Sequence, residues 1–117
     1  AASEDSAARP GCCGKAAQFE FTALAISRNF SASPHVDRND VCPQYALSLG
    51  DFDAREGHGA LCVEESPFQV RVLRTKNRLV SIDGRFPHWV AGYDGSKERY
   101  SVIWYRSLPP VEAVVQA

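Results

Sequence analysis

FPHWVAGYDGSKERYS, residues 86–101, is the stretch that decides the fold expected for this chain. It reads as a strand, a tight turn and a second strand, because aromatic and β-branched residues continue from Tyr100 to Tyr105. His88 lies near the start of the first predicted strand and Arg99 near the start of the second. The stretch therefore predicts a hairpin that holds an imidazole and a guanidinium on one wall of a barrel. The imidazole suits a metal ion, and the guanidinium suits a carboxylate.

The rest of the chain is also a series of short predicted strands. Alternating apolar patterns predict strands over residues 19–29, 44–52, 60–64, 68–73 and 78–83, with Gly, Pro, Asn and Asp at the joints. We expect the strand at 19–29 to be covered on both faces. No segment sustains a 3.6-residue apolar period, so little helix is expected. About eight short strands, closely spaced, predict an all-β sandwich, barrel or jelly roll.

Length and composition favour one domain with flexible ends. A chain of 117 residues is long enough for one hydrophobic core. Residues 1–17 are expected to be a flexible leader, 18–107 the folded core and 108–117 a tail. The absence of Met suggests a fragment or a processed form. The net charge of −1 gives no strong nucleic-acid signal, and neither a secretory signal nor a membrane-spanning apolar run is expected.

The cysteines give a prediction about redox state and compartment. Cys12, Cys13, Cys42 and Cys62 contain no C-x-x-C pair, so the spacing speaks against a tetrahedral zinc site. The spacing does not identify disulfide pairs either. We expect mostly free thiols in a reducing compartment, and therefore an intracellular protein of the cytoplasm or nucleus.

Three residues have the chemistry of a metal centre. His35 and Asp37 are two positions apart, so in an extended segment they point to the same side. His88, from a distant strand, would complete a set of two histidines and one carboxylate. This is the ligand set of non-haem ferrous oxygenases. His58 stands between two glycines in a predicted turn and is expected to be a solvated loop residue.

Arg99 and Ser101 would form a carboxylate receptor on the neighbouring predicted strand. They are two positions apart and so share a face. A guanidinium and a hydroxyl aimed at the same cavity as a metal suit a dicarboxylate. The alternative is that Arg99 pairs with Glu98 or Asp94 at the turn, as surface arginines often do.

Together these motifs resemble the Fe(II)- and 2-oxoglutarate-dependent dioxygenase superfamily. The matching pieces are His35-Val36-Asp37, His88 and Arg99-Tyr100-Ser101, in that order. The connecting sequence at 45–52 and 59–64 is also similar to stand-alone members of this superfamily, and the resemblance covers about residues 19–106. The segment at 98–102 resembles the last core strand of the prolyl-hydroxylase-like and TET/JBP-like branches, and both branches stay open.

The resemblance implies a double-stranded β-helix, an eight-stranded jelly roll, with a site in its mouth. Fe(II) would be held by His35, Asp37 and His88, and 2-oxoglutarate and O₂ would be cosubstrates. The far carboxylate of 2-oxoglutarate would pair with Arg99 and Ser101, and Tyr45 could add a hydroxyl. The resemblance also implies that Arg38 and Asn39 lie at the rim, where they touch substrate or brace Asp37.

The substrate and the oligomeric state are not predicted. A peptide, a nucleobase and a small molecule all stay open, with peptide hydroxylation favoured on family frequency. The loop at 53–59 replaces a Gly-Gly pair common in similar proteins, and N-terminal buttressing elements are not seen. The alternatives are therefore a non-catalytic, cupin-like jelly-roll module that binds a metal or ligand, and an inactive fragment of a larger oxygenase.

Overall fold

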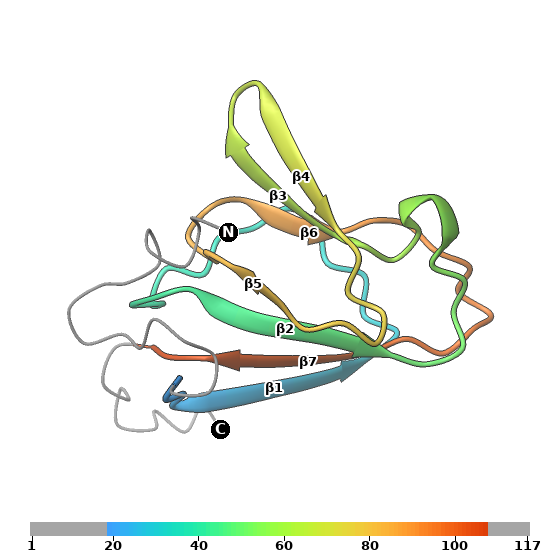
Figure 1. The fold of residues 1–117 in the computed structure, drawn as a ribbon, viewed down its shortest axis with the longest axis horizontal. Helices are drawn as coiled ribbons and strands as arrows, with labels where there is room; N and C mark the ends of the chain where they lie inside the picture. Colours follow the sequence, from blue (N-terminus) through green and yellow to red (C-terminus); the bar gives the residue numbers. More distant parts are fainter. Residues whose placement is uncertain (1–18, 108–117) are drawn as a thin grey trace, which may run out of the picture.

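Seven β-strands and one 3₁₀ turn make up the regular structure of residues 19–107, the part of the chain that this computed structural model describes (Figure 1). The elements are β1 (Ala23–Arg28), β2 (Gln44–Leu49), η2 (Arg55–Gly57), β3 (Leu61–Ser66), β4 (Gln69–Leu73), β5 (Val80–Ile82), β6 (His88–Val90) and β7 (Tyr100–Tyr105). The predicted all-β class is confirmed, and each strand falls within or beside a segment with the predicted alternation.

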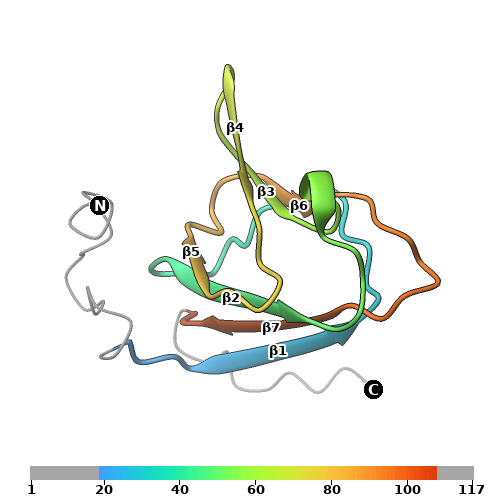
Figure 2. The ribbon, with the colours of Figure 1, turned by 45° about the vertical axis from the view of Figure 1, so that its right-hand side comes forward.

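The strands form two antiparallel sheets. One has the order β1-β7-β2-β5 and the other β4-β3-β6. An isolated bridge between His35 and His88 adds the segment after β1 to the free edge of β6. Figures 1 and 2 show the sheets as two walls, with the β3–β4 hairpin projecting beyond them. Apolar side chains fill part of the space between the walls, among them Ala46, Leu61, Val63 and Ile82.

The predicted hairpin at 86–101 is wrong. β6 pairs with β3, whereas β7 pairs with β1 and β2 in the other sheet. The tight turn itself is present, because Lys97 N donates to Asp94 O at 3.1 Å. However, residues 91 and 92, which follow β6, still run beside the segment that leads into β3. Ala91 N donates to Ala60 O, and Gly59 N donates to Gly92 O. The turn then redirects the chain into the opposite sheet, so His88 and Arg99 lie on different walls.

The expectation that the first strand is covered on both faces is also wrong. β1 is an edge strand with β7 as its neighbour, and most of its residues are exposed. Ile26 keeps 66% of its surface exposed. Its side chain lies on the outer face of the sheet, where the described residues supply no further layer. An apolar run thus predicted the strand correctly, but it could not show how many layers would cover it.

Several predictions fall outside the described residues, namely the leader at 1–17, the tail at 108–117, Cys12 and Cys13. Within the described part, Cys62 is a free, buried thiol, and burial raises its pKa. Cys42 is also buried. Among residues 19–107, no helix has the length and apolar character needed to cross a membrane.

Candidate metal centre

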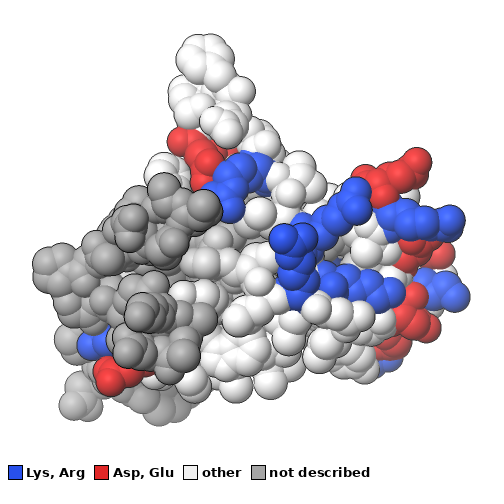
Figure 3. Space-filling view, viewed as in Figure 1, with Lys and Arg blue, Asp and Glu red and all other residues white. Residues whose placement is uncertain are grey.

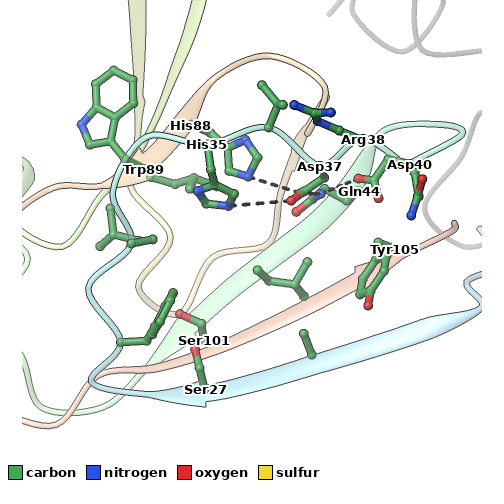
Figure 4. Close-up of a pocket in the computed structure, with 18 of the residues that line it drawn as sticks. Ser27, His35, Asp37, Arg38, Asp40, Gln44, His88, Trp89, Ser101 and Tyr105 are labelled. Carbon is green, nitrogen blue, oxygen red and sulfur yellow. Dashed lines mark hydrogen bonds and ion pairs between the residues drawn. The ribbon is translucent and has the colours of Figure 1, made fainter. Parts of the chain in front are cut away.

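His35, Asp37 and His88 converge between the two sheets (Figure 4). One ligand atom from each lies within 4.8 Å of the others. Backbone bonds fix all three residues: His35 N donates to His88 O at 3.1 Å, His88 N to His35 O at 3.0 Å, and Asp37 N to Gly84 O at 2.8 Å. The bridge to β6 therefore brings the early His35–Asp37 pair to the late histidine.

Both imidazoles are oriented by backbone carbonyls. Nδ1 of His35 lies 2.8 Å from Ser33 O, and Nδ1 of His88 lies 2.9 Å from Phe86 O. A carbonyl can only accept, so each Nδ1 carries the proton and donates it, which leaves Nε2 for other contacts. Nε2 of His88 is 3.3 Å from Asp37 Oδ2, and Nε2 of His35 is 3.7 Å from Asp37 Oδ1. Two nitrogens and a carboxylate thus face one point, as a divalent metal requires.

Electrostatics couple Asp37 to His88 in the metal-free protein. Burial opposes ionisation of Asp37, but hydrogen bonds from His88 and Gln44 outweigh it and lower the pKa of the carboxyl. Burial likewise opposes protonation of His88, but its bonds to Asp37 and to Phe86 O outweigh that effect and raise the pKa of the imidazole. A metal ion would replace the proton that this pair shares.

A buried amide supports the carboxylate from behind. Gln44 Nε2 donates to Asp37 Oδ2 at 2.9 Å and to Asp40 Oδ2 at 2.7 Å. Asp40 is buried, and desolvation raises its pKa to about 6. Neither supporting residue was predicted as part of the site. Asp40 could have been noticed, because it lies three positions after Asp37, but nothing in the sequence indicates the direction of the Gln44 side chain.

Gly84 leaves room for this cluster, which predicts a measurable effect of adding one methyl group. A Cβ there would meet Gln44 Nε2 and would lie 2.7 Å from Asp37 Oδ2 and 2.8 Å from Asp40 Oδ2. We expect Gly84→Ala to displace Asp37 and weaken binding of a divalent metal about 10- to 100-fold, the range seen when the support of a ligand is lost. Anaerobic metal titration measures this. Gly95→Ala is the matched control, because a Cβ there has nothing within 4 Å.

A cavity of about 560 Å³ lies beside the three ligands. Its far wall is the inner face of β1 and β7, where Ser27 and Ser101 are cross-strand neighbours (Figure 4). Arg38 and Asn39 are exposed and also line the cavity. Both residues therefore lie at the exposed edge of the cavity.

Arg99 is buried without an acidic partner among the described residues. Only 3% of its surface is exposed. Its Nε donates to Gly59 O at 3.0 Å and its Nη1 to Ser101 Oγ at 2.6 Å, while the guanidinium lies over the Phe52 ring. Burial lowers the pKa of Arg99. The guanidinium does not itself line the cavity but lies behind Ser101, which does.

The alternative reading of Arg99 as a surface ion pair does not describe this structure. Glu98 pairs with Arg28 at 2.6 Å, and Asp94 accepts from Ser96 within its own turn. The backbone of Arg99 is held instead by Asn29, whose Oδ1 accepts from Arg99 N at 2.7 Å and whose N donates to Arg99 O at 2.7 Å. Arg99 is thus fixed at the start of β7 with its charge uncompensated by the described residues.

The structure does not bring Tyr45 to the cavity. Gln44, Ala46 and Ser48 form the buried face of β2, so Tyr45 points to the other side of the sheet. There its ring contacts Phe19, with ring centroids 4.9 Å apart. The position of Ser48 next to Ser101 in the β2–β7 register shows which face of β2 belongs to the site.

The fold and the site together define an all-β protein with a candidate metal centre of two histidines and one aspartate. No protein-family model and no curated protein sequence matches the chain.

Proposed function

We propose that the chain is an Fe(II)- and 2-oxoglutarate-dependent dioxygenase built on a jelly roll, the double-stranded β-helix. One observation carries the proposal. Two histidines and an aspartate converge on one side of a cavity, and the opposite wall contains Ser101, which is bonded to a buried arginine that has no acidic partner among residues 19–107. The proposed metal site and the proposed carboxylate site would thus lie on two walls of one space.

The pairing of the strands supports the jelly roll. Such a fold is a long antiparallel hairpin that curls on itself, so that the first of eight segments pairs with the last, the second with the seventh, and so on. If the segment at His35 is counted as the second, the observed pairs follow this rule: β1 with β7, His35 with β6, β2 with β5, and β3 with β4.

The three ligands fit ferrous iron. Two neutral imidazoles and one carboxylate are the donor set of the facial triad, which leaves coordination positions for a keto acid and O₂. Iron, 2-oxoglutarate and O₂ would supply the oxidising chemistry: one oxygen atom of O₂ would enter a C–H bond of the substrate as a hydroxyl group, and the other would enter the succinate formed when 2-oxoglutarate loses CO₂. The chain keeps both Nε2 atoms available through the Nδ1 bonds, and Gln44 holds Asp37 Oδ2 so that Oδ1 faces His35.

Arg99 and Ser101 fit the far carboxylate of 2-oxoglutarate. A buried guanidinium that bonds to a carbonyl and a hydroxyl is desolvated without a compensating negative charge. A carboxylate entering beside Ser101 would supply that charge and could accept a bond from the Ser101 hydroxyl, which the guanidinium supports from behind. Arg38 and Asn39 at the rim would meet the substrate.

An anaerobic titration tests the proposal. Ferrous iron is added to the purified chain, then 2-oxoglutarate, and the visible spectrum is followed. We expect a charge-transfer band that appears only when protein, iron and keto acid are all present, and that is lost in Asp37→Ala. Iron binding without the band after 2-oxoglutarate is added would overturn the proposal and favour the non-catalytic, cupin-like metal-binding module.

A further inference from the structure

The β3–β4 hairpin exposes apolar side chains away from the cavity. Phe68, in the turn, keeps 96% of its surface exposed, and Val70 and Val72 on β4 keep 47% and 55%. Figure 2 shows the hairpin projecting from the two sheets, and Figure 3 shows no acidic or basic side chain at its tip. Clustered apolar residues on a projecting element are typical of an interaction surface.

β4 also ends its sheet. The strand order β4-β3-β6 leaves one side of β4 without a neighbour among the described residues. Natural edge strands are usually protected by proline, a bulge or outward charges. β4 has no proline, and its one charged residue, Arg71, is paired with Glu65 at 2.6 Å. The irregularity in the hairpin lies between Glu64 and Ser66, on the β3 side. The free edge of β4 can therefore accept another strand.

We propose that this strand is β4 of a second copy of the chain, paired antiparallel about a two-fold axis at Val70. This register places Val70 opposite its own copy, Gln69 opposite the partner's Arg71 and Phe68 beside the partner's Val72. A register centred one residue later would set Arg71 against the partner's Arg71, and like charges directly opposite are unfavourable. The register centred on Val70 is thus self-complementary, as a two-fold interface requires.

The dimer would join the two small sheets into one continuous sheet of six strands, β6-β3-β4 followed by the same strands of the partner in reverse. His88 lies on β6, at the far side of the small sheet from this junction. The metal centre stays outside the interface, so a variant can lose dimerisation and keep ligand binding, or the reverse. The contact is small for a protein interface, so we expect a dissociation constant on the order of micromolar or weaker.

Sedimentation equilibrium over a range of chain concentrations tests the proposal. We expect a concentration-dependent dimer in the unmodified chain, and Val70→Lys should weaken it about 5- to 30-fold, because the Val70 pair is lost and two ammonium groups are placed opposite each other. Ile26→Lys is the matched control, since Ile26 is an exposed apolar residue on the other sheet's edge strand. A monomer up to about 1 mM, or a dimer that Ile26→Lys dissociates and Val70→Lys does not, would overturn the proposal.

Cross-linking tests the register and does not depend on the lysine variant. Directly opposed residues in an antiparallel pair have Cα atoms about 4.5–5.5 Å apart, within reach of a disulfide. We expect Val70→Cys to form a covalent dimer on mild oxidation. Val72→Cys should not, because the two copies of residue 72 would be about 14 Å apart. The unmodified chain controls for its own cysteines, and cross-linking of Val72→Cys alone would contradict the proposed axis.

Discussion

Replacement of His88 by alanine is expected to lower the affinity for ferrous iron by well over about 100-fold, because loss of a mere supporting contact already costs 10- to 100-fold. The sheets should remain folded. The bonds that join the His35 segment to β6 are between backbone atoms, so they do not need the imidazole. The lost side-chain bonds and the space left behind should reduce the free energy of unfolding by about 1–3 kcal/mol.

Anaerobic iron titration and thermal unfolding of the same samples measure the two effects of His88→Ala. His58→Ala is the matched control, because His58 is an exposed histidine after the 3₁₀ turn η2. The iron affinity of His58→Ala should equal that of the unmodified chain. If His88→Ala instead unfolds the protein while any folded fraction binds iron normally, His88 is a core residue and the assigned centre is wrong.

Replacement of Arg99 by methionine is expected to lower the affinity for 2-oxoglutarate by about 100-fold or more, the cost of removing one member of a buried charge pair. Iron affinity should be unchanged, because Arg99 contacts none of the three ligands in the described structure. The free energy of unfolding of the unliganded protein should change by no more than about 2 kcal/mol, because the substitution has two effects that oppose each other. Removal of a buried, uncompensated cation is favourable, whereas Gly59 O loses its donor.

Ligand-dependent thermal shifts under anaerobic conditions measure the effect of Arg99→Met. In the unmodified chain with iron, 2-oxoglutarate should raise the unfolding temperature, because a ligand that binds only the folded state stabilises it. Arg99→Met should lose this shift, and Arg74→Met, a change at an exposed arginine, should keep it. Equal losses of iron and 2-oxoglutarate binding in Arg99→Met would show that Arg99 supports the fold of the whole site.

The local pattern of the sequence predicted strands well because alternation is a property of each segment alone. β4 and β5 lie inside their predicted ranges, and His35, Asp37 and His88 were found because their chemistry is rare in a chain with three histidines. No strand range was predicted at His35. The segment there makes a single bridge, which is too short to produce an alternating pattern.

The same pattern could not predict which face of a strand points to the site, or which of the two sheets a strand joins. In β2 the more apolar set, which includes Tyr45 and Leu47, lies on the outer side, whereas Gln44 and Ser48 are buried toward the site. Normal burial preferences point the other way. The stretch at 86–101 has the local form of a hairpin, but its strands found better partners far away in the sequence, in β3 and in β1 and β2.

The register of β1 with β7, which joins Ala23 to Tyr105, has a consequence for the order of folding. Pairings between such distant parts of a chain form slowly, because their closure entropy must be overcome before any contact is gained. As the chain is synthesised, β1, His35 and Asp37 emerge long before β6 and β7. Until then β1, with its apolar Ile26, lacks β7, its neighbouring strand among the described residues. The candidate metal centre is therefore assembled late, and metal binding there would report that the last strands have closed the fold.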